Sequence, residues 1–170
     1  NGHAAEYTLE ITANNLTVNA GGSIDVDGKG FQGHLLGNEN NGLGGGLSIT
    51  SSIYGITGGG GGYVGRGGRG WRADSIGGLT YGTATAPVDL GSGGGRAKGN
   101  SPGSDISGGQ GGGAIKLIIA DTLRLEGSVS ANGSNGNIAL AGAWNNYGSG
   151  GGSGGSVFIV TENLLGSGTL

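Results

Sequence analysis

The stretch AIKLIIADTLRLEGSVSANGSNG, residues 114–136, contains the pattern from which the fold is predicted. Its apolar residues alternate with other residues in three short runs, which is typical of strands that bury one face. The polar pair Asp121–Thr122 separates the first two runs, and Asn132–Gly133 follows the third. Asn and Gly favour turns, so the stretch is predicted to be three strands joined by polar corners.

Two other stretches, residues 7–30 and 156–170, align with this one and indicate an internal repeat. A polar pair precedes the same leucine in each copy, and the third copy stops at the position of its last expected strand. The aligned positions are Leu16, Leu123 and Leu164; Ile24 and Val129; and Asp27–Gly28 and Asn132–Gly133.

Three strands with corners in about 20 residues are typical of one coil of a parallel β-helix, whose coils stack to bury a common core. We therefore predict an all-β fold: one module, residues 1–170, with coil units at the three aligned stretches. Long glycine-rich insertions are expected at about 31–113 and 137–155. A sandwich of hairpins is the alternative fold, and a polyglycine II bundle is a further alternative for the glycine-rich parts.

Composition excludes several classes of protein. The chain has 47 glycines in 170 residues but only 2 prolines and no G-X-Y register, which excludes collagen. It has no cysteine, so disulfides and thiolate metal sites are excluded. A net charge of −3 argues against nucleic acid, and no apolar run reaches the ~20 residues of a membrane span. With no Met, the chain is expected to be a module of a longer protein.

Residues for catalysis are sparse, so we expect that the protein is not an enzyme. The only histidines, His3 and His34, are not spaced as zinc ligands. The run GGGGGYVGRGG, residues 58–68, lacks the Gly-Lys-Ser/Thr ending of a phosphate-binding loop. The acidic residues lie mostly at predicted β corners, whereas a glycosidase needs two facing carboxylates.

A calcium site is predicted at the corner SIDVDGKG, where Asp25 and Asp27 precede a glycine. Calcium takes six to eight oxygen ligands, and glycine-rich turns provide backbone carbonyls. The alternative is that these aspartates only form Asx-turns. Loop acids that could complete the coordination shell are Glu39, Asp74, Asp89 and Asp105.

Five aromatic residues in the insertions are the candidate carbohydrate-binding residues. Flat amphipathic rings on a scaffold are suited to stacking on sugar faces. The alternative is that they cover the bare glycine loops as a secondary core. The rings are Tyr63, Trp71, Tyr81, Trp144 and Tyr147, and the polar residues that flank them are Arg66, Arg69, Arg72, Asp74, Asn145 and Asn146.

Backbone cleavage is a further hypothesis, through succinimide formation at asparagines followed by small residues. Asn100–Ser101, within GGGRAKGNSPGSD, is the candidate cleavage site. Asn41–Gly42, Asn132–Gly133 and Asn135–Gly136 are comparable bonds. The alternative is that these asparagines are inert turn residues.

Three glycine-rich stretches carry a resemblance to a known family: GGLTYGTATAPVDLGSGGG (77–95), GGGAIKL with LEGSVSANGSNG (111–136), and GSGGGSGGSVFIVTENLLGSG (148–168). From about residue 43 onward the chain resembles carbohydrate-binding module family 54, found beside S-layer-homology domains in cell-surface glycanases such as chitinases and laminarinases. The resemblance implies a right-handed parallel β-helix, calcium, and binding to insoluble polysaccharide such as chitin, β-glucan or xylan.

The expected function is therefore that of a non-catalytic module on the bacterial cell surface, outside the cell. Its partners would be insoluble polysaccharide and the neighbouring catalytic and wall-anchoring domains of a parent chain. Neither nucleic acid nor membrane insertion is expected. The alternatives are a structural or adhesive spacer that binds no sugar, and a polysaccharide lyase.

Overall fold

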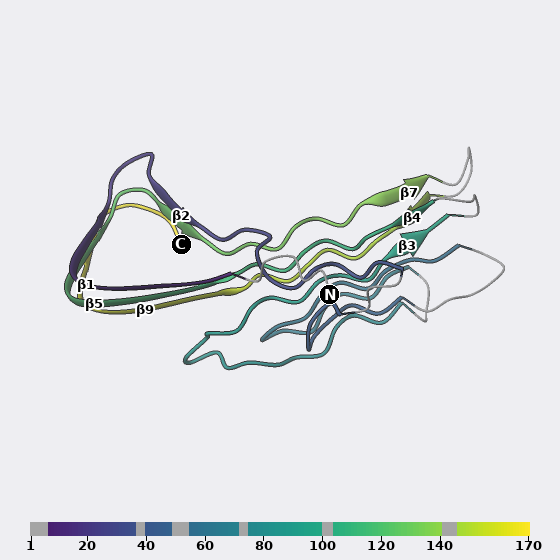
Figure 1. Ribbon diagram of the computed structural model, residues 1–170, viewed down its shortest axis with the longest axis horizontal. Helices are drawn as coiled ribbons and strands as arrows, with labels where there is room; N and C mark the ends of the chain where they lie inside the picture. The colour runs from purple at the N-terminus through teal and green to yellow at the C-terminus, as the bar shows by residue number, and fades with distance from the viewer. Residues whose placement is uncertain (1–6, 37–39, 49–54, 72–74, 100–103, 141–145) are drawn as a thin grey trace.

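The computed structural model describes residues 7–36, 40–48, 55–71, 75–99, 104–140 and 146–170. It divides into a stack of strands at one end of the long axis and a glycine-rich region at the other (Figure 1). The strands are β1 (Thr8–Val18), β2 (Ser23–Asp25), β3 (Ala97–Lys98), β4 (Asp105–Ile106), β5 (Ala114–Leu125), β6 (Ser128–Ser130), β7 (Ile138–Leu140), β8 (Asn146–Gly148) and β9 (Ser156–Leu165). No helix in the described ranges is long and apolar enough to cross a bilayer.

The three aligned stretches form the stack, in the predicted register. The long strands are parallel in the order β1-β5-β9, and Leu16 pairs with Leu123, which pairs with Leu164. The short strands β2 and β6 are also parallel, with Ile24 opposite Val129. Period-2 alternation in each strand therefore places equivalent apolar residues in rows that continue from one repeat to the next.

The core of the stack lies between the long strands and the short ones, and its centre is the second repeat. Ile115, Leu117 and Leu123 of β5 and Val129 of β6 are at most 1 % exposed. Their counterparts in the first and third repeats are partly buried or, at Leu164, exposed, because each has a neighbouring repeat on one side. Burying such a side chain contributes about 1.5–3 kcal/mol, so the middle repeat provides most of this stabilisation.

The predicted right-handed parallel β-helix is wrong. The described strands form sheets of three, two, two and two strands, and they close no coil. The first two predicted strands of a unit are one strand with a register irregularity, between Ala13 and Asn15 in β1. After β2, and again after β6, the chain continues into the glycine-rich region. The short strand pairs there, β3–β4 and β7–β8, are antiparallel. Glycine offers no side chains to bury, so it cannot form the third side of a coil.

Most of the glycine-rich region is instead a bundle of extended segments held by backbone hydrogen bonds, which we call the glycine bundle. In its central segment, residues 58–63, every N–H donates, and successive donors point to three different neighbours in turn. Every third donor returns to the same neighbour, which is the pattern of a chain with three residues per turn. The pairs, at N···O distances of 2.7–3.0 Å, are Gly58–Gly148, Gly61–Gly151, Gly59–Leu47, Gly62–Gly44, Gly60–Gly68 and Tyr63–Gly65.

The glycines of the bundle are required because the segments pack backbone against backbone. A Cβ at Gly58 would collide with the carbonyl of Gly95, and one at Gly67 would collide with the carbonyl of Gly60. The polyglycine II alternative therefore describes this region. Extended chains with this pattern bond to neighbours on several sides, whereas a β-strand bonds on only two.

Candidate functional site

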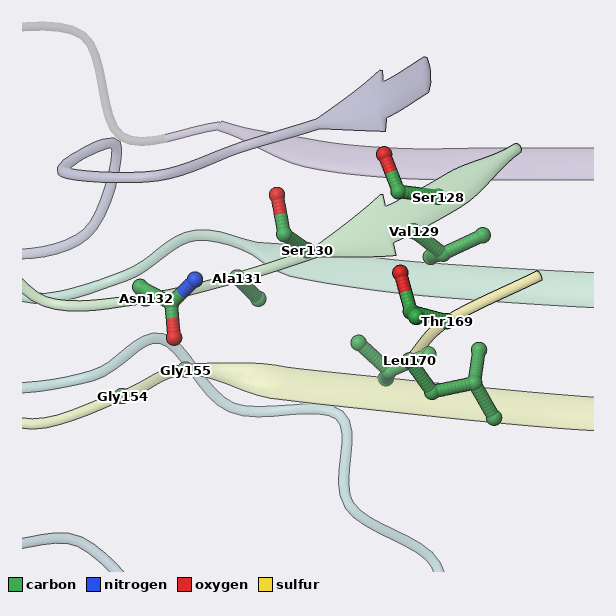
Figure 2. Close-up of a pocket in the computed structure, with 10 residues that line it drawn as sticks. Ser128, Val129, Ser130, Ala131, Asn132, Gly154, Gly155, Thr169 and Leu170 are labelled. Atoms are coloured by element: carbon green, nitrogen blue, oxygen red, sulfur yellow. The ribbon is translucent and has the colours of Figure 1, made fainter. Parts of the chain in front are cut away.

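A pocket of about 400 Å³ lies beside β6, and the third repeat contributes Val157, Thr169 and Leu170 to its lining (Figure 2). Its wall includes Ser128, Ser130 and Asn132, with Leu170 and Thr169 across from them. The N–H of Val129 donates to the carbonyl of Thr169 at 3.0 Å, which fixes this part of the tail beside β6. The lining residues include no ionisable side chain, so the pocket offers hydrogen bonds but no acid or base. Asn132, from one of the bonds considered for succinimide formation, lines it, whereas none of the described carbohydrate-binding or calcium candidates does.

The predicted calcium corner has both carboxylates exposed and hydrogen-bonded within the turn. Asp25 Oδ1 accepts the N–H of Asp27 at 2.7 Å, which is the Asx-type contact of the alternative interpretation. Asp27 reaches the next repeat, where Oδ1 accepts the N–H of Asn132 at 2.6 Å and Oδ2 accepts its side-chain amide at 3.2 Å. The corner thus links the first two repeats, and a calcium ion here stays a prediction.

The hydrogen bonds of Asp27 shift its pKa. Partial desolvation, the largest single contribution, raises the pKa of this carboxyl. The hydrogen bonds from the backbone and side chain of Asn132 and from Ser130 together outweigh it, so the pKa lies below the ordinary 3.8. Because donors stabilise the ionised form, the link between the two repeats depends on the charge of Asp27.

Asp105, one of the other acids considered for calcium, is paired elsewhere. Asp105 forms an ion pair with buried Arg96 and lies 3.7 Å from Lys98 Nζ. The described residues contain no group of three His, Cys, Asp or Glu that could hold a metal. Glu39 and Asp74 lie outside the described residues. The Arg96–Asp105 pair was not predicted, because nothing in the sequence distinguishes Arg96 from the other arginines.

Two of the candidate rings, Tyr63 and Tyr147, are packed inside the glycine bundle. Tyr63 is 8 % exposed and meets Tyr81 edge to face at 5.1 Å between ring centres. Tyr147 is 6 % exposed and forms a small core with Ala97 and Ile106. These two follow the secondary-core alternative, since a ring beside glycine packs directly on bare backbone.

Tyr81 is half-buried and belongs to a network of hydrogen bonds. Its hydroxyl donates to the carbonyl of Leu90 and accepts from Ser92 Oγ at 2.9 Å. Ser92 Oγ in turn accepts the N–H of Gly44 at 3.0 Å. Burial, the largest contribution, raises the pKa of the Tyr81 phenol, although the hydrogen bond from Ser92 opposes it. The hydroxyl of Tyr63 has no hydrogen-bond partner among the described residues.

Of the candidate rings that the structure describes, Trp71 lies on the surface, with 88 % of its area exposed. It follows Gly70, whose N–H donates to the carbonyl of Ser75 at 2.9 Å. The next residue after Ser75, Ile76, accepts a hydrogen bond from the N–H of Leu47. The exposed apolar residues on these neighbouring segments are Leu43, Leu47, Ile76 and Leu79.

Arg66 and Arg69 are exposed on the same segment as Trp71. The segment keeps the three-residue repeat of the bundle, because Gly67 and Gly70 both donate to residues 75–78. The remaining predicted residues have no described structure or side chain: Arg72, Trp144 and Asn145, the side chain of Asn146, and the cleavage pair Asn100 and Ser101.

The structure thus separates the predicted residues into interior, corner and surface groups, and it leaves Trp71 with its two arginines as the candidate binding site. Its described side chains are one indole and two guanidinium groups, which can bind a ligand by stacking and by charge-assisted hydrogen bonds. No protein family, no curated protein and no solved structure matches the chain.

Proposed function

We propose that the protein is a non-catalytic polysaccharide-binding module in which Trp71 is the stacking ring. The observation that carries the proposal is the 88 % exposure of Trp71 on an ordered glycine bundle. An exposed tryptophan loses a large contact with water when it stacks on the apolar face of a sugar. Because two other candidate rings are buried, Trp71 is the residue with area to offer.

The scaffold supports this role because it holds the ring in place before binding. Gly70 is bonded to Ser75, and the same segment is bonded through Gly68 to Gly60 and through Gly67 to Gly78. A ring on a backbone segment that is already ordered loses less conformational entropy when it binds a ligand. An ordered segment of this kind suits the binding of a polymer, which makes many weak contacts.

The neighbourhood of Trp71 also favours binding over an inert surface. Leu47 and Ile76, on the segments bonded beside it, are 49 and 37 % exposed. Exposed apolar patches on soluble proteins commonly mark interaction sites. On this proposal the module would hold a parent surface enzyme on insoluble glycan, outside a bacterial cell.

The proposal is tested by retention on insoluble chitin, β-glucan and xylan. We expect Trp71→Ala to lose retention, while Val64→Ala, which trims an exposed apolar residue at the other end of the same segment, keeps it. Both variants should keep the parent's thermal midpoint because both side chains project into solvent. Unchanged retention of Trp71→Ala would contradict the proposal. Repeating the assay and the melt with a chelator tests the predicted calcium, whose removal should lower the midpoint.

A structural spacer is the second candidate function, and one observation favours it. The glycine bundle is held by its own backbone hydrogen bonds, so it needs no ligand to stay folded. A spacer predicts that the chain is retained on none of the polysaccharides, with or without calcium, while its thermal stability is unchanged by any of them.

A further inference from the structure

The segment that carries Trp71 has one side of bare backbone open to solvent. A Cβ built at Gly65 or at Gly68 would meet nothing within 4 Å. A Cβ at Gly67 would lie 2.8 Å from the Gly78 nitrogen, and one at Gly70 would lie 2.6 Å from Ser75 Cβ, so those two glycines face the bundle. Open and crowded positions therefore follow the three-residue repeat of the hydrogen bonds.

Trp71 occupies the next position in the open series, after Gly65 and Gly68. At about 3.1 Å per residue, the three positions span roughly 19 Å along the segment. We call this series the open track: Gly65, Gly68 and Trp71. Along it, a flat ligand meets backbone without side chains at two positions and an exposed indole at the third.

Positive charge borders the open track. Arg66 and Arg69 follow its two glycines, are both exposed, and are spaced by the same three residues. They recur about 9 Å apart along the segment. The described residues of the neighbouring segments, 44–48, 58–63 and 75–81, contain no acidic residue. Two exposed cationic side chains thus border the track, on a chain whose net charge is −3.

We propose that the open track binds a polysaccharide that carries carboxylates, such as a uronic acid polymer, with its sugar rings on the bare glycines and Trp71 and its carboxylates on Arg66 and Arg69. The inference rests on the proposed function and names its substrate class. Guanidinium groups bind carboxylates through paired, charge-assisted hydrogen bonds. A regular polymer presents its carboxylates at a fixed repeat, which a row of evenly spaced arginines can meet.

Nucleic acid is the other polyanion to consider, and the surface fits it less well. Binding to nucleic acid depends on neutralising many phosphates over a wide basic field. Here two arginines border a track whose remaining contacts are apolar or backbone. A sugar polymer of low charge density matches two spaced cations and one ring.

The experiment measures binding of the whole chain to polygalacturonate, to the same polymer with its carboxylates methyl-esterified, to xylan and to RNA. We expect polygalacturonate to bind more tightly than its ester, and salt to weaken that difference because it screens exposed charges. Arg66→Gln and Arg69→Gln should each weaken binding to polygalacturonate by about fivefold and leave the ester unaffected. Trp71→Ala should weaken binding to both polymers.

Gly68→Leu tests the track itself, because the side chain would enter open space without disturbing the bundle. We expect it to block both polymers without lowering the thermal midpoint. Equal binding to polygalacturonate and its ester, or arginine variants that bind like the parent, would overturn the inference. The proposed function would still stand if retention depended on Trp71. Retention on no polysaccharide would overturn both. RNA binding as tight as polygalacturonate, with the same arginine dependence, would also overturn the inference.

Discussion

The strand stack and the glycine bundle hold the same chain together by opposite means. In the stack, side chains such as Leu117 and Leu123 fill the space between layers, and neither is exposed at all. In the bundle, the interior is backbone, and carbonyls occupy the places where side chains would stand. The stack requires large side chains at its interior positions, whereas the bundle requires residues that have no side chain. Substitutions that shrink or enlarge a side chain should therefore have opposite consequences in the two regions.

The largest effect is expected from Leu117→Ala in the stack. It removes a fully buried side chain from the middle repeat and should lower the free energy of unfolding by about 2–5 kcal/mol. Leu164→Ala, in the third repeat, removes a side chain that is 55 % exposed and should cost only about 1 kcal/mol. Denaturant titrations measure both values, and equal losses would contradict the assignment of the core to the second repeat.

The matched test in the bundle is Gly67→Ala against Gly68→Ala. At Gly67 the new methyl group collides with the Gly60 carbonyl, so we expect a loss of about 1–3 kcal/mol or more. At Gly68 the methyl group meets open space, and less backbone freedom in the unfolded state should stabilise the protein by about 0.4–1 kcal/mol. Thermal melts measure the change in stability of each variant. If both substitutions stabilised the protein, or both destabilised it, backbone packing would be contradicted as the reason for the glycines.

Tyr63 and Tyr81 test whether the bundle also depends on side-chain interactions. Tyr81→Phe leaves the Leu90 carbonyl and the Ser92 hydroxyl without their partner, so it should cost about 1–3 kcal/mol. Tyr63→Phe removes a buried hydroxyl that has no partner among the described residues, so it should be neutral or stabilising. Chemical denaturation of the two variants tests this difference, and a costly Tyr63→Phe would contradict it.

The raised pKa of Tyr81 adds a dependence on pH. Its contribution to stability is complete below the ordinary value of 10.0. It should decline as the pH rises above that value, because the unfolded tyrosine ionises before the folded one. As the pH rises above about 10, stability should fall less steeply in Tyr81→Phe than in the parent. Parallel slopes would contradict the shift.

The smallest effect is expected at the corner that links the first two repeats. Asp27→Asn should cost less than about 1 kcal/mol, since the carboxylate is exposed. Because the folded pKa is lowered, the contribution of Asp27 is present above the ordinary 3.8 and is lost as the pH falls through the folded value. Acid titration of unfolding should show this loss in the parent and not in the variant.

The sequence predicted the stack well and the bundle poorly, for one physical reason. Rows such as Leu16, Leu123 and Leu164 repeat because side chains must meet across strands, so alignment of the repeats was enough to predict their register. Glycine segments carry no such pattern, and their pairing depends on which backbones lie side by side. The polyglycine II arrangement could be named as an alternative, but the sequence does not predict which segments lie side by side in it.

The candidate site shows the same limit. An aromatic ring beside glycine has two outcomes, packing on bare backbone or projecting from it, and local sequence does not distinguish Tyr63 from Trp71. The structure buries Tyr63 and exposes Trp71 because the first lies in the central segment and the second at the end of the segment 65–71. The open track could not be predicted either, since Gly67 and Gly68 look alike in the sequence and differ only in their neighbours.

Amide hydrogen exchange in residues 58–63 tests the central claim most directly. In the bundle all of these consecutive N–H groups donate to other segments, so we predict that all exchange slowly. An edge β-strand would protect alternate amides, and an unstructured glycine loop would protect none. Uninterrupted protection from Gly58 to Tyr63 is the result we predict, and alternate or absent protection would contradict the glycine bundle.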